Sequence, residues 1–269
     1  MYELLGYFSA ILIGVTLGLI GGGGSILTVP VLVYIMGINP VLATAYSLFI
    51  VGLSALVGAF KNGKMGNIDY KTGFVFAVPS FIAVYYTRSI LVPSIPQEIF
   101  NFPISYTNNF VLNKDMAIML FFALVMLLAA FSMIKGRVEK GEQKDKKFNY
   151  PIIIIEGLFV GVITGLVGAG GGFLIIPALV LLAGLPMKKA VGTSLMIIAI
   201  KSLIGFTGDL STSLIIDWKF LASFSVLAVI GIILGTYLSK FIQGDKLKRV
   251  FGYFVLMMAV IVIIKELVL

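Results

Sequence analysis

The chain has 269 residues, of which 59% are hydrophobic and only 12% are charged, and its formal net charge is +8. Soluble domains contain about 25% charged residues, so a fraction half as large indicates a protein that lies in a lipid bilayer. The chain has no cysteine and no histidine, which excludes disulfides, thiolate nucleophiles, imidazole bases and His/Cys metal sites. We therefore expect an all-α, polytopic helical membrane protein that is not an enzyme and holds no cofactor.

The first apolar segment begins MYELLGYFSAILIG and has no basic residue before it. Because a secretory signal peptide starts with a basic region, we expect this segment to be a retained helix. A bilayer core requires roughly 20 apolar residues per helical span. In chain order, apolar stretches predict helical segments at residues 3–20, 25–36, 42–60, 72–90, 115–134, 152–167, 173–184, 189–206, 220–239 and 249–266.

Two longer connections separate these segments. Residues 135–151 form a charged, turn-rich linker, and residues 91–113 hold three prolines with several asparagines and serines. Such compositions are typical of turns and loops. We expect a surface linker at 135–151 and an irregular surface loop at 91–113.

The chain contains an internal repeat that is marked by two glycine runs. The sequence GLIGGGGSILTVP at 18–30 aligns with GLVGAGGGFLIIP at 165–177 without a gap. A glycine cluster inside an apolar stretch interrupts a helix, and two matched interruptions are typical of transporters built from repeats. We expect one transmembrane domain, 1–269, with repeats at 1–134 and 152–269 joined by the linker 135–151. Each repeat is expected to contain a glycine-broken helical hairpin and three transmembrane helices.

The distribution of basic residues indicates how the two repeats are oriented relative to each other in the membrane. If each glycine-broken pair returns to its starting side, the repeats are inverted, and 15 basic residues fall on one side against 4 on the other. If each pair is one kinked span, the split is 11 to 8. The positive-inside rule favours inverted repeats in the cell membrane, with the linker 135–151 cytoplasmic and both termini outside. The second limbs of about 12 residues span only ~18 Å, which favours re-entrant hairpins over full crossings.

The second half resembles the sulfite exporter TauE/SafE family. The resemblance rests on the glycine run with its following proline, on AVGTSL at 190–195 and on IIDWKFLASF at 215–224, and it extends over both halves. It implies a membrane transporter for a small sulfur-containing anion such as sulfite or a sulfonate. Many members carry a histidine near the end of the span after GTSL, where this chain has Asp209 in GFTGDL.

The glycine runs are the first candidates for substrate binding. Helices that begin near Gly24 and Gly171 present unpaired N–H groups and the positive end of the helix dipole. Inverted repeats would aim both ends at one point near the midplane, where an oxyanion can accept hydrogen bonds. We expect this cradle to contain Gly22, Gly23, Gly24, Ser25, Thr28, Gly170, Gly171 and Gly172, with the first run the more polar. The alternative is that the glycines only allow close helix crossing, as we expect for Gly14 and Gly18.

Polar residues inside later spans are the second group of candidates. Ser47, Thr193 and Ser194 occupy matched positions, where their hydroxyls contact substrate or bond to their own helix. Lys201 is a lone basic residue in mid-span, which either neutralises an anion or pairs with Asp209 or Glu156. Asp209 and Glu156 are candidate proton carriers.

Asp69 and Asp217 also occupy matched positions in the two repeats, just before an aromatic residue. We interpret both as helix caps.

We expect a secondary transporter that exports its anion by alternating access. A carrier or channel for another small anion is the alternative, although a channel would need a continuous polar lining. The expected partners are a small anionic substrate and the lipid bilayer. The basic residues lie in short loops, which anionic lipids explain better than nucleic acid. The sequence leaves open a homo-oligomer and the coupling ion.

Overall fold

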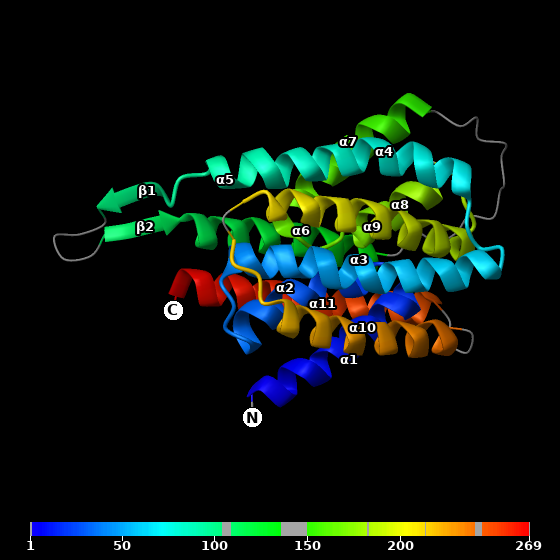
Figure 1. Ribbon diagram of the computed structural model, residues 1–269, viewed down its shortest axis with the longest axis horizontal. Helices are drawn as coiled ribbons and strands as arrows, with labels where there is room; N and C mark the ends of the chain where they lie inside the picture. Colours follow the sequence, from blue (N-terminus) through cyan, green and yellow to red (C-terminus); the bar gives the residue numbers. More distant parts are fainter. Residues whose placement is uncertain are drawn as a thin grey trace.

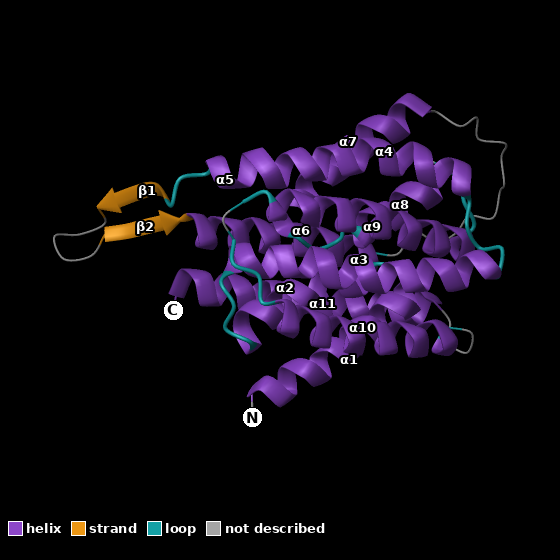
Figure 2. Ribbon diagram, in the orientation of Figure 1, coloured by secondary structure: helices purple, strands orange, loops and turns teal. Residues whose placement is uncertain are grey.

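The computed structural model describes residues 2–103, 109–135, 150–181, 183–212, 214–239 and 244–268. The chain forms a bundle of long helices, with a small strand pair that extends beyond one end (Figures 1 and 2). The helices of the first half are α1 Tyr2–Ile20, α2 Thr28–Pro30, α3 Pro40–Lys64, α4 Tyr70–Tyr86, α5 Val92–Ser94 and α6 Lys114–Ile134. Those of the second half are α7 Tyr150–Val167, α8 Gly172–Leu181, α9 Met187–Leu210, α10 Trp218–Leu238 and α11 Gly244–Val268.

Three short stretches of 3-10 or π-helix adjoin these α-helices. A 3-10 helix, η1, spans Gly23–Leu27, and π-helices form η2 at Val31–Ile35 and η3 at Thr87–Leu91. Both η1 and η2 belong to the hairpin that follows the first glycine run. π-Helical turns inside α-helices occur frequently at functional sites.

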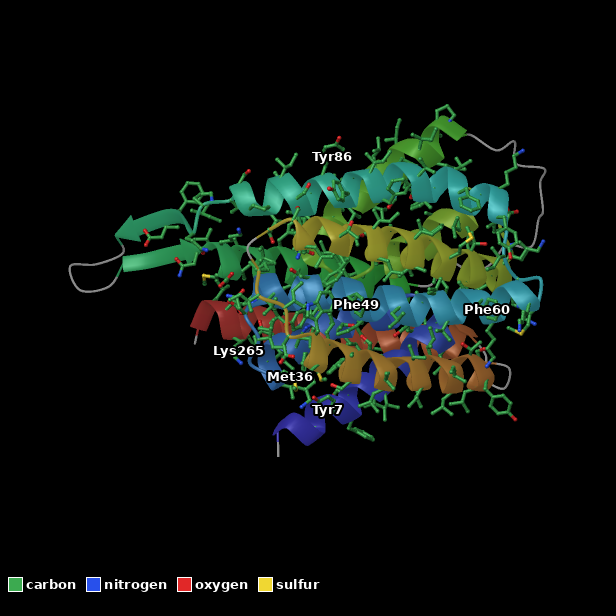
Figure 3. All side chains as sticks on the ribbon, viewed as in Figure 1. Tyr7, Met36, Phe49, Phe60, Tyr86 and Lys265 are labelled. Carbon is green, nitrogen blue, oxygen red and sulfur yellow. The ribbon has the colours of Figure 1, made fainter. Side chains whose placement is uncertain are left out.

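Within the described residues, five helices are long and apolar enough to cross a membrane: Pro40–Lys64, Tyr70–Ser94, Lys114–Ser132, Met187–Leu210 and Trp218–Leu238. Large apolar side chains point outward along these helices; Phe60 is 67% exposed and Tyr86 is 58% exposed (Figure 3). An apolar outer surface of this kind fits a lipid environment. The prediction of a polytopic helical membrane protein is therefore confirmed.

Helices of the two halves pair crosswise. The first helix of each half packs on a later helix of the other half, α1 on α10 and α7 on α4. Glycines allow the close approach: a Cβ added to Gly18 would lie 2.6 Å from the carbonyl oxygen of Ile232, and one on Gly161 would lie 2.5 Å from that of Ser80. Gly18 thus serves helix crossing, as the small-residue pattern indicates.

The matched helices α3 and α9 pack along each other in opposite directions. Gly58, near the end of α3, faces Leu195 near the start of α9, while Gly205 faces Leu48. Antiparallel packing of equivalent helices is what inverted repeats produce. The inverted arrangement in the membrane stays a prediction.

Both predicted helix caps are confirmed. The Asp69 carboxylate accepts a hydrogen bond from the Thr72 amide at 2.9 Å, and that of Asp217 accepts one from the Phe220 amide at 3.0 Å. Each cap is also tied to the other half, because the Asp69 amide donates to Thr193 Oγ1 and the Asp217 amide donates to Tyr46 Oη.

The expectation of an irregular loop at 91–113 is wrong. After α5, residues Glu98–Pro103 and Asn109–Asn113 form an antiparallel strand pair, β1 and β2. The prolines do not prevent this, since Pro93 lies in the first turn of α5 and Pro103 is the last residue of β1. Proline is tolerated in a helix's first turn and at the edge of a strand pair. Most of the predicted linker, residues 136–149, lies outside the described residues.

Candidate functional site

The two glycine runs lie against each other inside the bundle. A Cβ added to Gly22 would lie 2.5 Å from the Cα of Gly172, so neither position has room for a side chain. Gly22 has a φ of 152°, and Gly170 and Gly171 each have a φ of 63°. Glycine adopts these left-handed conformations at little cost, whereas other residues are strained there. The runs therefore meet, while their binding of an anion stays a prediction.

Gly172 offers a direct test of this contact, because it is helical and alanine can adopt its conformation. We expect Gly172→Ala to destabilise the protein by about 1–3 kcal/mol, the usual cost of overpacking, since the new Cβ would lie 2.6 Å from Ile198 Cδ1 and would also strike Gly22. Unfolding in detergent micelles measures this. Gly63→Ala is the control: its Cβ would meet the tips of two side chains, Tyr70 Oη at 3.1 Å and Ile68 Cδ1 at 3.6 Å, so it should be neutral or stabilising. Equal stability of both variants would contradict the proposed contact.

Hydroxyl groups surround the first run. Ser194 Oγ donates to the Gly21 carbonyl oxygen at 2.6 Å, and Ser25 Oγ donates to that of Gly22 at 2.7 Å. Both hydroxyls therefore hold the backbone of the run in shape. Among the described residues, the buried hydroxyls of Thr28 and Ser47 have no hydrogen-bond partner, so both remain candidate donors.

Lys201 lies at the second run. Its side chain is fully buried, and Nζ donates to Thr164 Oγ1 at 2.9 Å. A Cβ added to Gly171 would lie 2.8 Å from the same Nζ. The ammonium group thus sits beside the glycines that precede α8. The charged group near the site thus lies beside the second run, while the hydroxyls of Ser25 and Thr28, on which the prediction of a more polar first run rests, belong to the first half.

The helix α8 starts directly at this ammonium group. The carbonyl oxygen of Gly171 accepts the first helical hydrogen bonds, from the amides of Leu174 and Ile175. The earlier amides of α8, at Gly172 and Phe173, have no carbonyl of a preceding helical turn available. A helix N-terminus and a lysine ammonium therefore favour negative charge at one point.

The suggested pairing of Lys201 with Asp209 or Glu156 is wrong. Asp209 instead binds Arg88, and Glu156 is half-buried on α7 with no ion pair among the described residues. The reason is depth: Asp209 lies in the last turn of α9, more than two helical turns from Lys201. Thr193 is occupied as the acceptor for the Asp69 amide.

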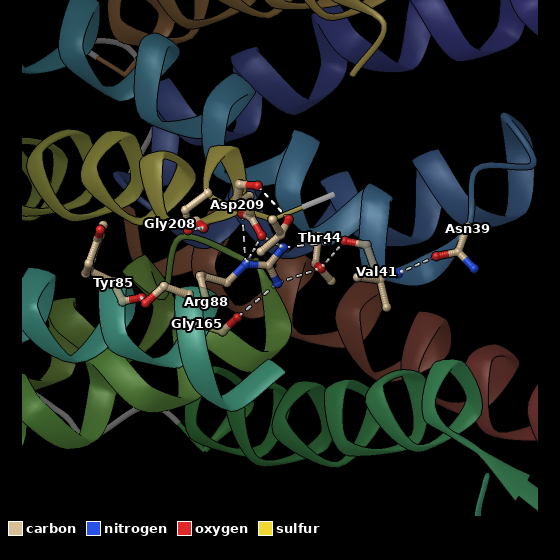
Figure 4. A network of polar contacts seen from close by, with 11 residues as sticks. Asn39, Val41, Thr44, Tyr85, Arg88, Gly165, Gly208 and Asp209 are labelled. Carbon is tan, nitrogen blue, oxygen red and sulfur yellow. Dashed lines mark hydrogen bonds and ion pairs between the residues drawn. The ribbon is translucent and has the colours of Figure 1, made fainter. Parts of the chain in front are cut away.

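A buried ion pair between Arg88 and Asp209 joins both halves at one end of the bundle (Figure 4). Arg88 Nη2 lies 2.7 Å from Asp209 Oδ1, and Arg88 Nε donates to the same carboxylate at 2.8 Å. Arg88 Nη1 donates to Thr44 Oγ1 at 2.9 Å and to the Gly165 carbonyl oxygen at 3.1 Å. One guanidinium group thus links η3, α9, α3 and α7.

Arg88 is one of the four basic residues that the charge count places on the outer side, and its pairing with Asp209 was not predicted. The structure buries its side chain completely, because helical structure continues past it through η3 to Ser94. A usable signal was present: Arg88 lies within the apolar stretch 72–90, and Asp209 is a lone acid at the end of another span. Two opposite charges within spans are candidates for pairing.

The fold and the site define a polytopic helical membrane protein whose two halves meet at paired helix breaks around buried polar groups, which is the design of a membrane transporter. The chain belongs to the sulfite exporter TauE/SafE family, whose sequence profile matches residues 7–262. The predicted family is confirmed, and with it a transporter that is not an enzyme.

Relatives in distant organisms carry the same description. The chain is 29% identical over 258 residues to a "Probable membrane transporter protein" of Xylella fastidiosa, covering 94% of this chain and 91% of that protein. It is 32% identical over 242 residues to the probable membrane transporter protein YjnA of Bacillus subtilis, covering 88% of each. A probable membrane transporter protein of Methanocaldococcus jannaschii is 26% identical over 208 residues, covering 75% of this chain and 70% of that protein. No solved structure gives a significant match.

Proposed function

We propose that this protein is a secondary transporter that exports a small sulfur oxyanion, sulfite or an organic sulfonate, through a cradle formed by the two glycine runs and Lys201. The cradle comprises Gly22–Ser25 and Gly170–Gly172, with Thr28 and Ser47 as free hydroxyl donors. Ser194 shapes the cradle through its bond to the Gly21 carbonyl oxygen, whereas Thr193 binds the Asp69 amide at the start of α4.

The observation that carries the proposal is the position of the Lys201 ammonium group. It is fully buried beside Gly171, and its one hydrogen-bond acceptor among the described residues is the Thr164 hydroxyl. An ammonium group has three N–H donors, so two remain available. A buried charge without an ionic partner is costly inside a membrane. An oxyanion at this point would neutralise the charge and take up the donors.

The substrate class and direction draw on the family and on elementary electrostatics. The family is described as a sulfite exporter family. An inside-negative membrane potential favours export of an anion by about 2.3 kcal/mol per charge per 100 mV. Inverted halves supply a route for alternating access, since the cradle lies where they meet and each half can rock against the other.

The test is transport by the purified protein in liposomes, with sulfite, thiosulfate, sulfoacetate and sulfate offered in turn. We expect saturable flux of at least one sulfur anion, which responds to an imposed membrane potential. Transport of another anion without any sulfur anion would refute the substrate class. Flux that rises linearly without saturation would favour the alternative, an anion channel, over a carrier.

The proposed orientation places the linker 135–151 in the cytoplasm and both termini outside the cell membrane. Reporter fusions at the C-terminus and within the linker test it. One reporter is of a kind that works only in the cytoplasm. If it is active when fused to the C-terminus, the C-terminus is cytoplasmic and the proposed orientation is wrong.

A further inference from the structure

We propose that this transporter has a second anion site at the outer end of the bundle, between Lys114 and Arg88, in which the anion competes with Asp209 for the Arg88 guanidinium group. The site rests on the proposed transport function, because it would hold the same class of small oxyanion between the outer solution and the Lys201 cradle. It differs from the cradle in residues and in position.

A cavity of about 300 Å³ lies at the end of the bundle from which β1 and β2 extend. This volume is well above the ~30 Å³ share of one water molecule in the liquid, so it has room for a small oxyanion with water. The polar part of its lining comes from the ends of several helices: Asn39, Arg88, Gln97, Lys114, Asp115 and Asp209. The predicted topology places this end outside.

The four charged residues of the cavity are unevenly paired. Asp209 is held by Arg88, and Asp115 Oδ2 accepts a hydrogen bond from Asn39 Nδ2 at 2.6 Å. Lys114 is only 7% exposed, and its ammonium group makes neither a hydrogen bond nor an ion pair within the described part of the chain, whereas its backbone amide donates to the Gln97 carbonyl oxygen at 2.9 Å. The Asp115 carboxylate attracts this ammonium group without making a hydrogen bond or ion pair with it. A buried ammonium group that lacks a hydrogen-bond acceptor among the described residues is the second observation that points to a ligand, because a bound anion would supply that acceptor.

Arg88 supplies the geometry for an oxyanion. Its Nε and Nη2 together face the Asp209 carboxylate, at 2.8 Å and 2.7 Å (Figure 4). This two-donor fork matches any oxyanion that presents two oxygens, so a sulfur oxyanion fits where the carboxylate now lies. An anion drawn in by Lys114 would therefore displace Asp209 and separate α9 from η3.

The outer site connects to the cradle through the last turn of α7. Arg88 Nη1 donates to the carbonyl oxygen of Gly165, and the preceding residue, Thr164, accepts from Lys201. The two buried cations therefore contact consecutive residues directly before the second glycine run. An anion released from one cation can pass to the other over a short distance.

Among the described residues, no such ion pair occurs at the opposite end of the bundle. By the repeat alignment, Thr236 stands for Arg88 and Asn62 for Asp209, and both bond to carbonyl oxygens of their own helices, Ile232 and Gly58. These neutral side chains form no tie between the halves. Within the described residues, the two repeats thus differ here: the ion pair and its cavity occur at one end of the bundle only.

The experiment is equilibrium binding of radiolabelled sulfite, and of sulfate in parallel, to the full protein in detergent at constant ionic strength. Four variants are compared: Lys114→Gln, Lys114→Arg, Lys219→Gln and Lys201→Met. Lys219 is the matched control, because it is exposed and does not line the cavity. We expect two binding sites in the wild type, and a roughly tenfold weaker affinity at one of them in Lys114→Gln. Lys114→Arg and Lys219→Gln should bind as the wild type does.

Lys201→Met separates this inference from the proposed cradle. If it removes one site and the remaining site still depends on Lys114, both proposals are supported. If the Lys201 site is found and Lys114→Gln binds both anions as the wild type does, the outer site is refuted and the cradle stands. If binding depends on Lys114 but not on Lys201, the cradle fails and the outer site stands. If Lys219→Gln weakens anion binding as much as Lys114→Gln does, the effect comes from the overall charge of the protein, and the outer site is also refuted.

Discussion

Lys201→Met is expected to lower the transport rate by about 10- to 100-fold while leaving the protein as stable as the wild type, or more stable. A hydrogen bond to a charged group contributes about 1.5–3 kcal/mol, which corresponds to this range of rates if the bond is made to the anion. The variant removes a fully buried charge that has no ionic partner in the described part of the chain, and such an unpaired charge is itself costly inside a membrane. Thr164 keeps its own hydrogen bond, since its hydroxyl donates to the Val160 carbonyl oxygen at 2.6 Å.

Two measurements on the same preparation check this result: anion flux in liposomes and thermal unfolding in detergent. Lys219→Met is the control, as it removes an equal charge from an exposed position and should change neither. Wild-type flux in Lys201→Met would exclude the residue from the site. A large loss of stability would instead assign Lys201 a structural role.

The second prediction concerns the ion pair between Arg88 and Asp209. We expect Asp209→Leu and Arg88→Met each to destabilise the protein by about 3–5 kcal/mol, because each leaves the other partner as an uncompensated buried charge. Arg88 is completely buried and Asp209 is 1% exposed, so the charge that remains lies almost wholly inside the protein. The double variant Arg88→Met with Asp209→Leu should recover much of this loss, as apolar replacement of buried pairs often does.

A double-mutant cycle of unfolding in mixed micelles measures the coupling between the two residues. Glu156→Gln is the control, since Glu156 is half-buried on α7 and forms no ion pair among the described residues. Additive effects in the double variant would show that the two side chains do not depend on each other. That result would also remove the basis for exchange of Asp209 with an anion.

The sequence by itself determined where most of the helices lie along the chain. Apolar length, glycine and proline positions and the acidic caps are local signals, so the predicted segments agree with helices such as α3, α6 and α10 within a few residues. Self-comparison at an offset of 147 residues also identified the two glycine runs. The strand pair β1–β2 was missed because the prolines, asparagines and serines of residues 91–113 were together taken to indicate a loop.

The tertiary structure alone decided which polar groups meet. Lys201 could be placed in mid-span from sequence, but its position beside Gly171 depends on how α9 packs against the second glycine run. The pairing of Arg88 with Asp209 joins residues 121 positions apart, and no local pattern encodes that contact. A lone sequence gives the depth of a residue along its own helix, whereas helix packing sets which side chains face each other across the bundle. The paired glycines could therefore be read from the chain, and the charges around them only from the fold.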